Sequence, residues 1–381
     1  MAKPGHAEIA GAGFAGLTAA IALRQRGWTV RVHEASPVLR AFGAGIFIWE
    51  NGLRVLGAVD AYHDVITGSH QGEVLETRLN GVTATRQRFG REYGTRMVTL
   101  TRQHLYDAVL AAAQRAGVEI FTGSEAVGAE PAGILHTADG RSHRADLVIG
   151  ADGVKSCVRD SLGFAMQREV YQDGVIRLLA PWRRDALGEG DWHHVIDFWN
   201  LEANKPLRIL YVPCNERDVY LCFMSPRANV EASRVPVRKQ LWATAFPQIA
   251  PIISGIAEHG RYDFYELARL ERWWIGKVAL VGDSAHSMPP TLGQGAGCAL
   301  MNAIGLAVAL EEAATVEQAL DLWERRERPL TDHTQALAAD LARSRKLAEG
   351  HGWDDEALRA ARHVPTGCRV DAARVAAPGA T

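Results

Sequence analysis

Short apolar runs and helix-like stretches alternate over the first part of the chain. A buried strand is predicted over residues 7–10, a helix over 14–26 that ends at Gly27, and a second strand over 28–34. This order is a β-α-β unit, which predicts a parallel sheet. Three further elements continue the pattern: a helix over 103–116 and strands over 118–121 and 146–150.

The pattern changes beyond about residue 166. Short alternating runs, separated by turn residues, lie at 175–179, 194–199, 208–212 and 219–223. They predict a mainly antiparallel sheet, which a helix over 237–246 accompanies. The parallel-sheet pattern resumes at 277–281, and a long helical region follows from Gly295 to about Ala348.

The order of these patterns predicts an α/β fold in which one domain is inserted into another. A Rossmann-like domain is expected over 1–72, 95–165 and 272–345. A mainly antiparallel β-sheet domain that binds substrate is expected over 73–94 and 166–271. Residues 346–381 are predicted to form a C-terminal helix and a tail.

Composition narrows the function classes. The 381 residues carry 42 Lys and Arg against 44 Asp and Glu, so no global positive field attracts nucleic acid. The five cysteines contain no C-x-x-C pair, which argues against a disulfide framework or a zinc site. No signal peptide or transmembrane helix is expected, and a cytoplasmic protein that binds neither membrane nor nucleic acid is predicted. Glycine is in excess, with 37 residues where ordinary usage gives about 27.

Three of these glycines, Gly11, Gly13 and Gly16, form a G-x-G-x-x-G motif between the first strand and the first helix. Composition alone would produce such a motif roughly 0.3 times, so its position gives it weight. The first glycine permits a tight turn, the second lets a pyrophosphate approach the backbone, and the third allows close helix–strand packing. Glu34, at the end of the second strand, can accept hydrogen bonds from ribose hydroxyls. The alternative is a glycine-rich turn without a ligand.

Two later segments follow predicted strands and also carry glycine next to aspartate. The first contains Asp152 and Gly153, and the second begins at Gly282 and Asp283 and continues to a glycine-rich loop over 293–297. In this order, with the N-terminal motif, they resemble the DG and GD motifs of the class A flavoprotein aromatic hydroxylases, the family of para-hydroxybenzoate hydroxylase. The resemblance implies a FAD-binding domain of that type.

The resemblance further implies bound FAD, with NADH or NADPH as transient reductant and oxygen transfer from O2 through a flavin C4a-hydroperoxide. The helix beginning near Gly295 would then point its N-terminus at the flavin and stabilise the reduced anion. The alternatives to these FAD-binding roles are that Asp283 is an ordinary helix cap and that Arg102 is a solvated surface charge. The FAD-binding residues implied are Gly11, Gly13, Phe14, Ala15, Gly16, Glu34, Ala35, Arg40, Arg102, Val127, Asp152, Gly153, Asp283, Pro290, Gly293, Gln294, Gly295, Ala296 and Gly297.

Further stretches, at residues 40–46, 49–56, 208–216, 261–266 and 294–299, are similar to family members that oxygenate hydroxypyridine carboxylates. The similarity implies that Arg208 and Tyr220 bind substrate, because arginine pairs bidentately with a carboxylate and a tyrosine hydroxyl can bond a ring oxygen. The alternatives are that Arg208 is a surface charge and that Tyr220 is a core aromatic residue. Tyr265 and Arg177 are weaker candidates on the same grounds. Phe47 and Leu75 stand where tyrosines are expected at the site, which leaves the ring substituents open.

The function expected is a monooxygenase acting on a hydroxylated pyridine carboxylate, such as 2-methyl-3-hydroxypyridine-5-carboxylate or 5-hydroxynicotinate, with or without ring opening. The alternatives are a hydroxybenzoate- or salicylate-type hydroxylase, a non-catalytic FAD-fold binding protein, and an amine or hydroxy-acid oxidase. No metal is expected, and His286 is interpreted as part of the GD turn. The choice between NADH and NADPH and the oligomeric state stay open.

Overall fold

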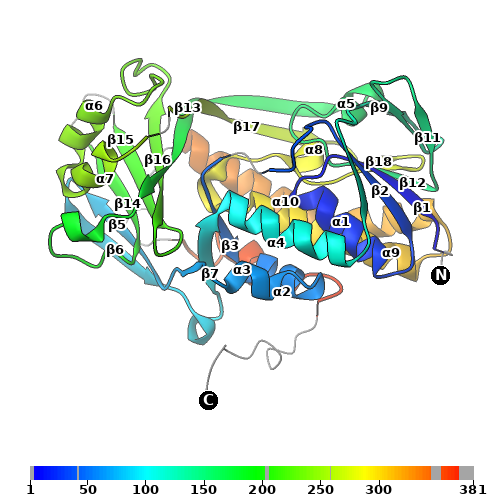
Figure 1. Ribbon diagram of the computed structural model, residues 1–381, viewed down its shortest axis with the longest axis horizontal. Coiled ribbons are helices and arrows are strands. Elements are labelled where there is room, and N and C mark those ends of the chain that lie inside the picture. Colours follow the sequence, from blue (N-terminus) through cyan, green and yellow to red (C-terminus); the bar gives the residue numbers. More distant parts are fainter. Residues whose placement is uncertain (1–3, 41–42, 202–205, 258, 345–352, 369–381) are drawn as a thin grey trace.

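A computed structural model describes residues 4–40, 43–201, 206–257, 259–344 and 353–368. Its first domain contains a six-stranded sheet of order β18-β19-β12-β1-β2-β8, parallel except for the antiparallel β18–β19 pair (Figure 1). The strands are β1 (His6–Ala10), β2 (Thr29–Glu34), β8 (Glu119–Thr122), β12 (Leu147–Gly150), β18 (Trp274–Ile275) and β19 (Val278–Leu280). The parallel sheet predicted from the β-α-β pattern is confirmed.

Helices pack against one face of this sheet, where α1 contacts β2 and packs directly against α9. Those of the first domain and the C-terminal region are α1 (Phe14–Arg24), α2 (Glu50–Ala58), α3 (Tyr62–Ile66), α4 (Arg102–Arg115), α5 (Cys157–Ser161), α8 (Asp283–His286), α9 (Gly295–Glu312), α10 (Val316–Ser344) and α11 (Arg359–Arg362). The helical region expected from Gly295 consists of two helices, α9 and α10, and its predicted end near Ala348 lies outside the described residues. Thr315 separates them, because its hydroxyl accepts a hydrogen bond from the backbone N–H of Gln318 and caps α10.

One of these helices, α9, is long and apolar enough to cross a membrane by length and composition, although no transmembrane helix is expected from the sequence. Most of α9 is buried, and it packs against α1, α2 and α10. Such burial is typical of the core helix of a soluble protein, and helices of that kind pass the same hydropathy test. We therefore assign α9 to the core of the first domain.

The second domain contains a seven-stranded sheet of order β17-β13-β16-β15-β14-β5-β6. Its strands are β5 (Val74–Leu79), β6 (Val82–Arg88), β13 (Met166–Pro181), β14 (Val195–Asn200), β15 (Leu207–Pro213), β16 (Asp218–Pro226) and β17 (Tyr262–Leu270). All neighbours pair antiparallel except β14 and β5, which are parallel. Both segments predicted for the substrate domain thus contribute strands to one sheet, while the exact domain boundaries stay a prediction.

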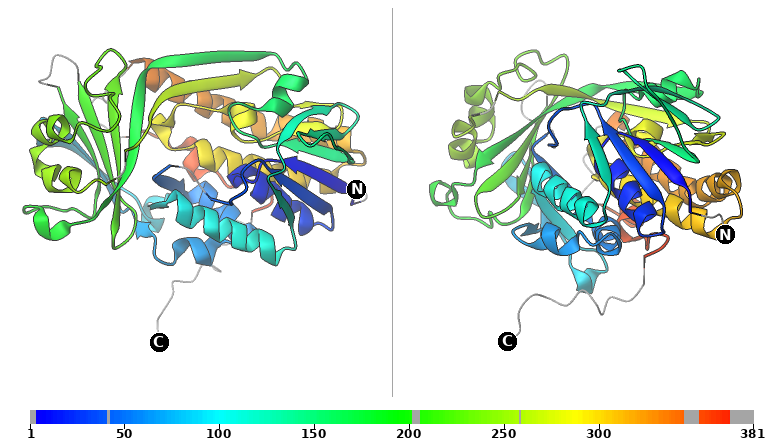
Figure 2. Two further views of the ribbon diagram at one scale, coloured as in Figure 1. Left: turned by 45° about the horizontal axis from the view of Figure 1, so that its top comes forward. Right: turned by 45° about the vertical axis from the view of Figure 1, so that its right-hand side comes forward.

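Because side chains alternate between the two faces along each strand, the two faces of this sheet differ. Ile176 and Leu178 of β13 belong to an apolar cluster with Trp242 of α6 (Lys239–Ala245) and Ile252 of α7 (Ala250–Ser254). The intervening residues face the other way, since successive side chains alternate across a strand. Strands β13 and β17 are long and run along the top of the molecule in Figure 1, joining the sheet to the first domain; Figure 2 shows the same bridge from two further sides.

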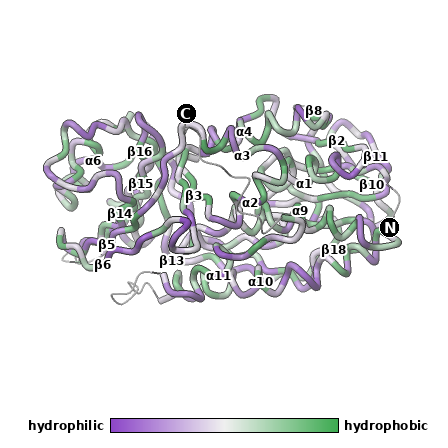
Figure 3. The backbone as a smooth tube through the Cα atoms, turned by 90° about the horizontal axis from the view of Figure 1, so that it is seen from below, coloured by the Kyte–Doolittle hydropathy of each residue, from purple (hydrophilic) through white to green (hydrophobic). Residues whose placement is uncertain are grey.

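Two small sheets were not predicted from the sequence. One contains β9 (Ala126–Glu130), β10 (Ile134–Thr137) and β11 (Ser142–Arg144), and the other β3 (Gly45–Trp49), β4 (His70–Gln71) and β7 (Met97–Thr101). Strand β3 lies between the two domains (Figure 3). Ile46 and Ile48 belong to the core of the first domain, whereas Phe47 and Trp49 belong to a cluster shared with the seven-stranded sheet.

Candidate active site

The glycine motif after β1 interlocks with the two later glycine segments. A Cβ on Gly16 would lie 2.0 Å from the carbonyl oxygen of Gly11, and a Cβ on Gly11 would lie 2.4 Å from that of Ala151. A Cβ on Gly282 would lie 2.9 Å from the Cβ of Ala15. These glycines are therefore required by close packing, and that packing brings the three motifs together at the carboxyl ends of the strands.

Gly13 and Gly295 differ, because nothing in the described protein requires glycine at either position. A Cβ on either residue would meet no described atom within 4 Å, and Gly13 has an ordinary φ of −76°. Both residues stand at the N-terminal end of a helix, α1 and α9, that has no side-chain cap and no acidic residue in its first turn. By contrast, Thr101 caps α4. Open space beside free N–H groups is what an anionic or electron-rich ligand needs.

Arg102 lies beside this space without a carboxylate bonded to it. Its guanidinium carbon is 5.1 Å from the centre of the Phe14 ring, and its Nε has no hydrogen-bond partner in the described part of the chain. Burial lowers the pKa of Arg102, and the nearby Asp283 opposes that shift. Gly43 has a φ of +94°, and a Cβ there would lie 2.8 Å from Cδ of Arg102. The glycine thus makes room for the arginine side chain.

The acidic residues predicted to bind FAD have distinct environments. Burial raises the pKa of Asp283, whereas Arg102 and Arg177 lower it. Asp152 accepts a hydrogen bond from the backbone N–H of Val158 through Oδ2, while its buried Oδ1 has no described partner. Burial also raises the pKa of Asp152.

Glu34 accepts hydrogen bonds from the backbone N–H groups of Ala12 and Ser36, each at 2.9 Å. It therefore fastens β2 to the glycine loop, and the remaining lone pairs stay available for ribose hydroxyls. Arg40, Ala35 and Val127 are exposed at this end of the domain.

These features fit FAD. Gly13 and Gly295, the uncapped N-terminal ends of α1 and α9, and Arg102, whose Nε has no partner among the described residues, together leave space and hydrogen-bond donors for a dinucleotide. The other FAD-binding residues predicted around α9 are Pro290, Gly293, Gln294, Ala296 and Gly297, which lie in or just before its first turn. The FAD-binding role of each individual residue stays a prediction.

The predicted substrate residues lie on the face of the seven-stranded sheet opposite α6 and α7. Phe47, Leu75, Tyr220 and Tyr265 belong to a single buried cluster. Registered pairing places Arg177 beside Cys222 on this face, two residues from Tyr220 along β16. The structure therefore brings together residues as far apart in the sequence as Phe47 and Tyr265.

Arg208 is held in one orientation by Asp197. Its Nε and Nη2 donate to the two carboxylate oxygens of Asp197 at 2.7 and 3.0 Å, and its guanidinium carbon lies 4.7 Å from the centre of the Trp199 ring. Trp199 Nε1 also donates to Asp197, at 2.9 Å. Burial alone would lower the pKa of Arg208, but Asp197 raises it overall. Asp197 therefore already occupies part of the hydrogen-bonding edge of Arg208 that was expected to bind a substrate carboxylate.

Tyr220 is placed by a glycine on the facing strand. A Cβ on Gly45 of β3 would lie 2.4 Å from the Tyr220 ring, so the ring packs directly on the β3 backbone. Burial raises the pKa values of Tyr220 and Tyr265, and both hydroxyls stay protonated at neutral pH. Burial also raises the pKa of Cys222 to about 11, which leaves a neutral thiol between the two tyrosines and the arginines.

Three residues of this face were missed from the sequence: Asp197, Asp263 and Cys222. Asp263 accepts a hydrogen bond from Arg177 at 3.3 Å. Asp197 lies two residues before Trp199 on the same strand, and Cys222 two residues after Tyr220. Period-two spacing from the candidates Tyr220 and Tyr265 could have identified Cys222 and Asp263, since alternate residues share a face, but no candidate residue lies on the strand of Asp197. The partner strand of Arg208 could not be identified in that way.

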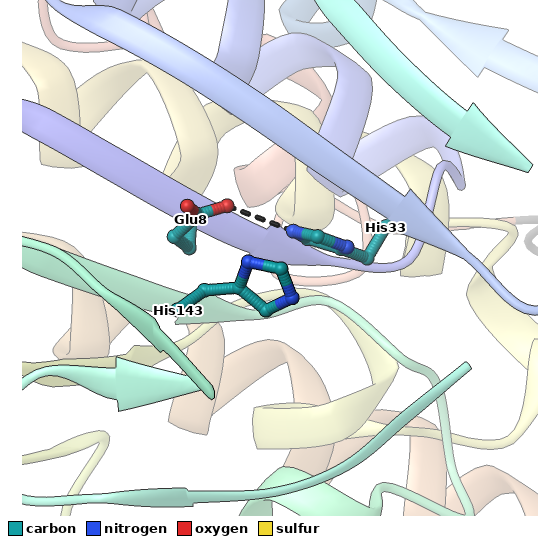
Figure 4. A group of neighbouring side chains, drawn as sticks. All are labelled: Glu8, His33 and His143. Carbon is teal, nitrogen blue, oxygen red and sulfur yellow. Dashed lines mark hydrogen bonds and ion pairs between the residues drawn. The ribbon is translucent and has the colours of Figure 1, made fainter. Parts of the chain in front are cut away.

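A separate polar cluster lies between the six-stranded sheet and the small β9–β11 sheet, with Glu8 on β1, His33 on β2 and His143 on β11 (Figure 4). Ligand atoms of Glu8, His33 and His143 lie within 4.8 Å of one another, which would suit a metal ion by residue type. However, Glu8 already accepts hydrogen bonds from His33 and His6 and forms an ion pair with Arg31, each at 2.8 Å. Burial alone would raise the pKa of Glu8, but these partners lower it. Because Arg31 also places a positive charge there, we assign the cluster to packing between the sheets.

Comparison with known proteins agrees with this geometry. Residues 6–337 match the family described as FAD binding domain. A crystal structure of 2-methyl-3-hydroxypyridine-5-carboxylic acid oxygenase superposes with a TM-score of 0.92 at 48% identity, covering 95% of this chain and 97% of that one. The 2-heptyl-3-hydroxy-4(1H)-quinolone synthase of Mycobacteroides abscessus is 39% identical over 88% of this chain and 89% of its own length. The 6-hydroxynicotinate 3-monooxygenase of Pseudomonas fluorescens is 27% identical, covering 89% and 92%.

Fold and site together define a flavoprotein oxidoreductase with a sheet-lined aromatic site. The chain belongs to the FAD-binding family of class A aromatic hydroxylases, and it is a flavoprotein monooxygenase. The predicted fold class, the FAD cofactor and the enzymatic function are confirmed, and NAD(P)H is the usual reductant of the family. A non-catalytic binding protein and an oxidase that works without NAD(P)H are not supported.

Proposed function

We propose that this monooxygenase acts on a hydroxylated pyridine carboxylate, such as 2-methyl-3-hydroxypyridine-5-carboxylate or 5-hydroxynicotinate. The observation that carries the proposal is the fixed guanidinium of Arg208, on the sheet face that also presents Tyr220 and Tyr265. A planar guanidinium with a preset orientation loses little freedom when it binds a ring carboxylate. The 48% identity to a pyridine-carboxylate oxygenase supports the same substrate class.

Bound FAD would supply the reducing equivalents that activate O2 for transfer to the ring. Arg208 would orient the carboxylate, using the edge that Asp197 leaves open. Tyr220, kept neutral by burial, would bond the ring oxygen. Phe47 and Leu75 would hold the ring by apolar contact and exclude water from the reaction.

Phe47 and Leu75 also affect which product is expected. Phe47 and Leu75 carry no hydroxyl that could anchor water beside the ring. We therefore keep simple hydroxylation and oxygenation with ring opening as two outcomes to be measured. A cytoplasmic location likewise stays a prediction.

A second candidate is oxygenation of a neutral 4-quinolone. Two observations favour it: the apolar character of Phe47 and Leu75, and the neutralisation of Arg208 by Asp197 before any substrate binds. The relative named 2-heptyl-3-hydroxy-4(1H)-quinolone synthase adds to them. The two candidates differ in whether the substrate carries a carboxylate.

Purified holoenzyme can distinguish these candidates in a panel of pyridine acids, hydroxybenzoates and 2-heptyl-4(1H)-quinolone. Substrate-stimulated NADH and NADPH oxidation is recorded for each compound. The proposal predicts stimulation by hydroxypyridine carboxylates and a much weaker response to the same rings without the carboxylate. Stimulation by the quinolone or by hydroxybenzoates alone would contradict it.

A further inference from the structure

The segment from Trp353 onwards lies against the substrate sheet, although it is remote from that sheet in the sequence. The backbone N–H of Trp353 donates to Oε1 of Gln87 at 2.9 Å, and the Trp353 carbonyl accepts from Nε2 of Gln87 at 2.6 Å. Asp354 caps the following turn through the backbone N–H of Ala357, at 2.9 Å. Trp353 is thus fixed by a reciprocal pair of hydrogen bonds to β6 and by an ordered turn.

The residue that anchors Trp353 stands next to a predicted substrate position. Gln87 pairs with Leu75 in the β5–β6 register, so both side chains leave the same face of the sheet. Leu75 belongs to the buried cluster that contains Tyr220 and Tyr265. The backbone of Trp353 is therefore held at the edge of that cluster.

The Trp353 ring contacts the other wall of the same site. It meets Trp49 edge-on, with ring centres 5.2 Å apart, and Trp49 stacks on Phe47 at 6.3 Å. The indole nitrogen of Trp49 lies 3.3 Å from a Cβ built on Gly293, in the loop that precedes α9. Trp353 also packs against the small cluster that contains Leu292.

We propose that Trp353 is the outer wall of the aromatic-substrate site and keeps water from the site of oxygen transfer. Trp353 is half-buried, with one side on the buried cluster and the other towards solvent. The inference rests on the proposed position of the substrate beside Phe47 and Leu75. A coupled turnover converts NADH, H+, O2 and substrate into NAD+, water and the oxygenated product. If the activated oxygen is lost instead, NADH, H+ and O2 give NAD+ and H2O2.

The test uses the FAD-loaded variant Trp353→Ala and two measurements. The first is iodide quenching of the flavin fluorescence, which requires no substrate. We expect the quenching constant to rise by about threefold, because removing the indole opens the site to solvent. The second is the ratio of H2O2 formed to NADH oxidised with the most active compound of the panel, which we expect to rise by about twofold. Trp353→Phe should restore both values towards those of the wild type.

Arg362→Ala is the matched control, since Arg362 ties the same C-terminal segment to Thr95 through a 2.9 Å hydrogen bond, while its own side chain is exposed and does not belong to the cluster. It should change neither measurement. Should Trp353→Ala not fold, Gln87→Leu removes the reciprocal hydrogen bonds from the opposite side and should raise the quenching constant. Unchanged quenching in a variant that retains FAD would overturn the inference, whatever the substrate panel shows. A panel without active pyridine acids would overturn only the proposed substrate.

Discussion

The FAD side of the site and the sheet that faces it are built in different ways. The FAD side uses backbone: Gly11 and Gly16 pack so closely that no Cβ fits, and α1 and α9 present uncapped N–H groups. The sheet uses side chains, of which Arg208 and Tyr220 are fixed by Asp197 and Gly45. Backbone binding is shared by proteins with many substrates, whereas we propose that the side chains of the sheet determine which ring is bound.

The largest effect should follow from a methyl group added to the glycine loop. Gly16→Ala places a Cβ 2.0 Å from the backbone oxygen of Gly11, so the turn or the helix must shift. We expect a loss of about 3 kcal/mol in the free energy of unfolding, with or without FAD, as for other overpacked sites. Urea unfolding of apoprotein and holoenzyme measures it.

Gly57→Ala in α2 is the control for that change. A Cβ on Gly57 would meet nothing within 4 Å, so alanine should stabilise the helix by about 0.5–1 kcal/mol. Equal stability losses in the two variants would show that the close packing at Gly16 is unimportant.

In the seven-stranded sheet, Arg208→Ala should weaken substrate binding without releasing FAD. Loss of a charge-assisted hydrogen bond is worth about 2 kcal/mol, which raises the substrate KM about thirtyfold. Asp197→Asn keeps the guanidinium but removes the charge that orients it, so a smaller rise in KM is expected at nearly constant kcat. If substrate affinity is unchanged in Arg208→Ala, this arginine does not bind the substrate.

Acid should weaken the FAD-binding domain through His286. Its Nε2 is 2.9 Å from Asn302, and burial lowers its pKa to about 4. Because the unfolded chain binds this proton near the ordinary pKa of about 6.5, stability is lost as pH falls from there towards 4, by about 2 kcal/mol at pH 5. His286→Gln should lack this part of the pH dependence in urea unfolding. An identical pH dependence in both proteins would contradict the assignment.

Gly13→Ala separates ligand binding from folding. The added methyl group meets no described atom within 4 Å, so the apoprotein should lose less than about 1 kcal/mol of stability. The same methyl group would occupy space that FAD needs, and we expect the Kd for FAD to rise about tenfold, or about 1.4 kcal/mol. Fluorescence titration of apoprotein with FAD gives the Kd. An unchanged Kd would place the pyrophosphate elsewhere.

The contrast between the two regions also explains what the sequence could predict. The glycine loops were found because a backbone requirement leaves a local signature: residues 11–16 lie together in the chain. The partner of Arg208 could not be found that way, since Asp197 reaches it through the β14–β15 register, which the sequence does not state. Likewise, nothing local indicates that Gly45 makes room for Tyr220, or that Trp353 packs against Trp49. Such contacts depend on the tertiary arrangement of the strands.

The measurement that tests the central claim most directly is the mass of the product formed from 2-methyl-3-hydroxypyridine-5-carboxylate under isotopically labelled O2. The account predicts an NAD(P)H-dependent product that carries one labelled oxygen atom, with a second, unlabelled oxygen atom from water if the ring is also opened. Activity should fall in Arg208→Ala while FAD stays bound. Unlabelled substrate recovered alongside H2O2, while 2-heptyl-4(1H)-quinolone gains a labelled oxygen, would contradict the claim.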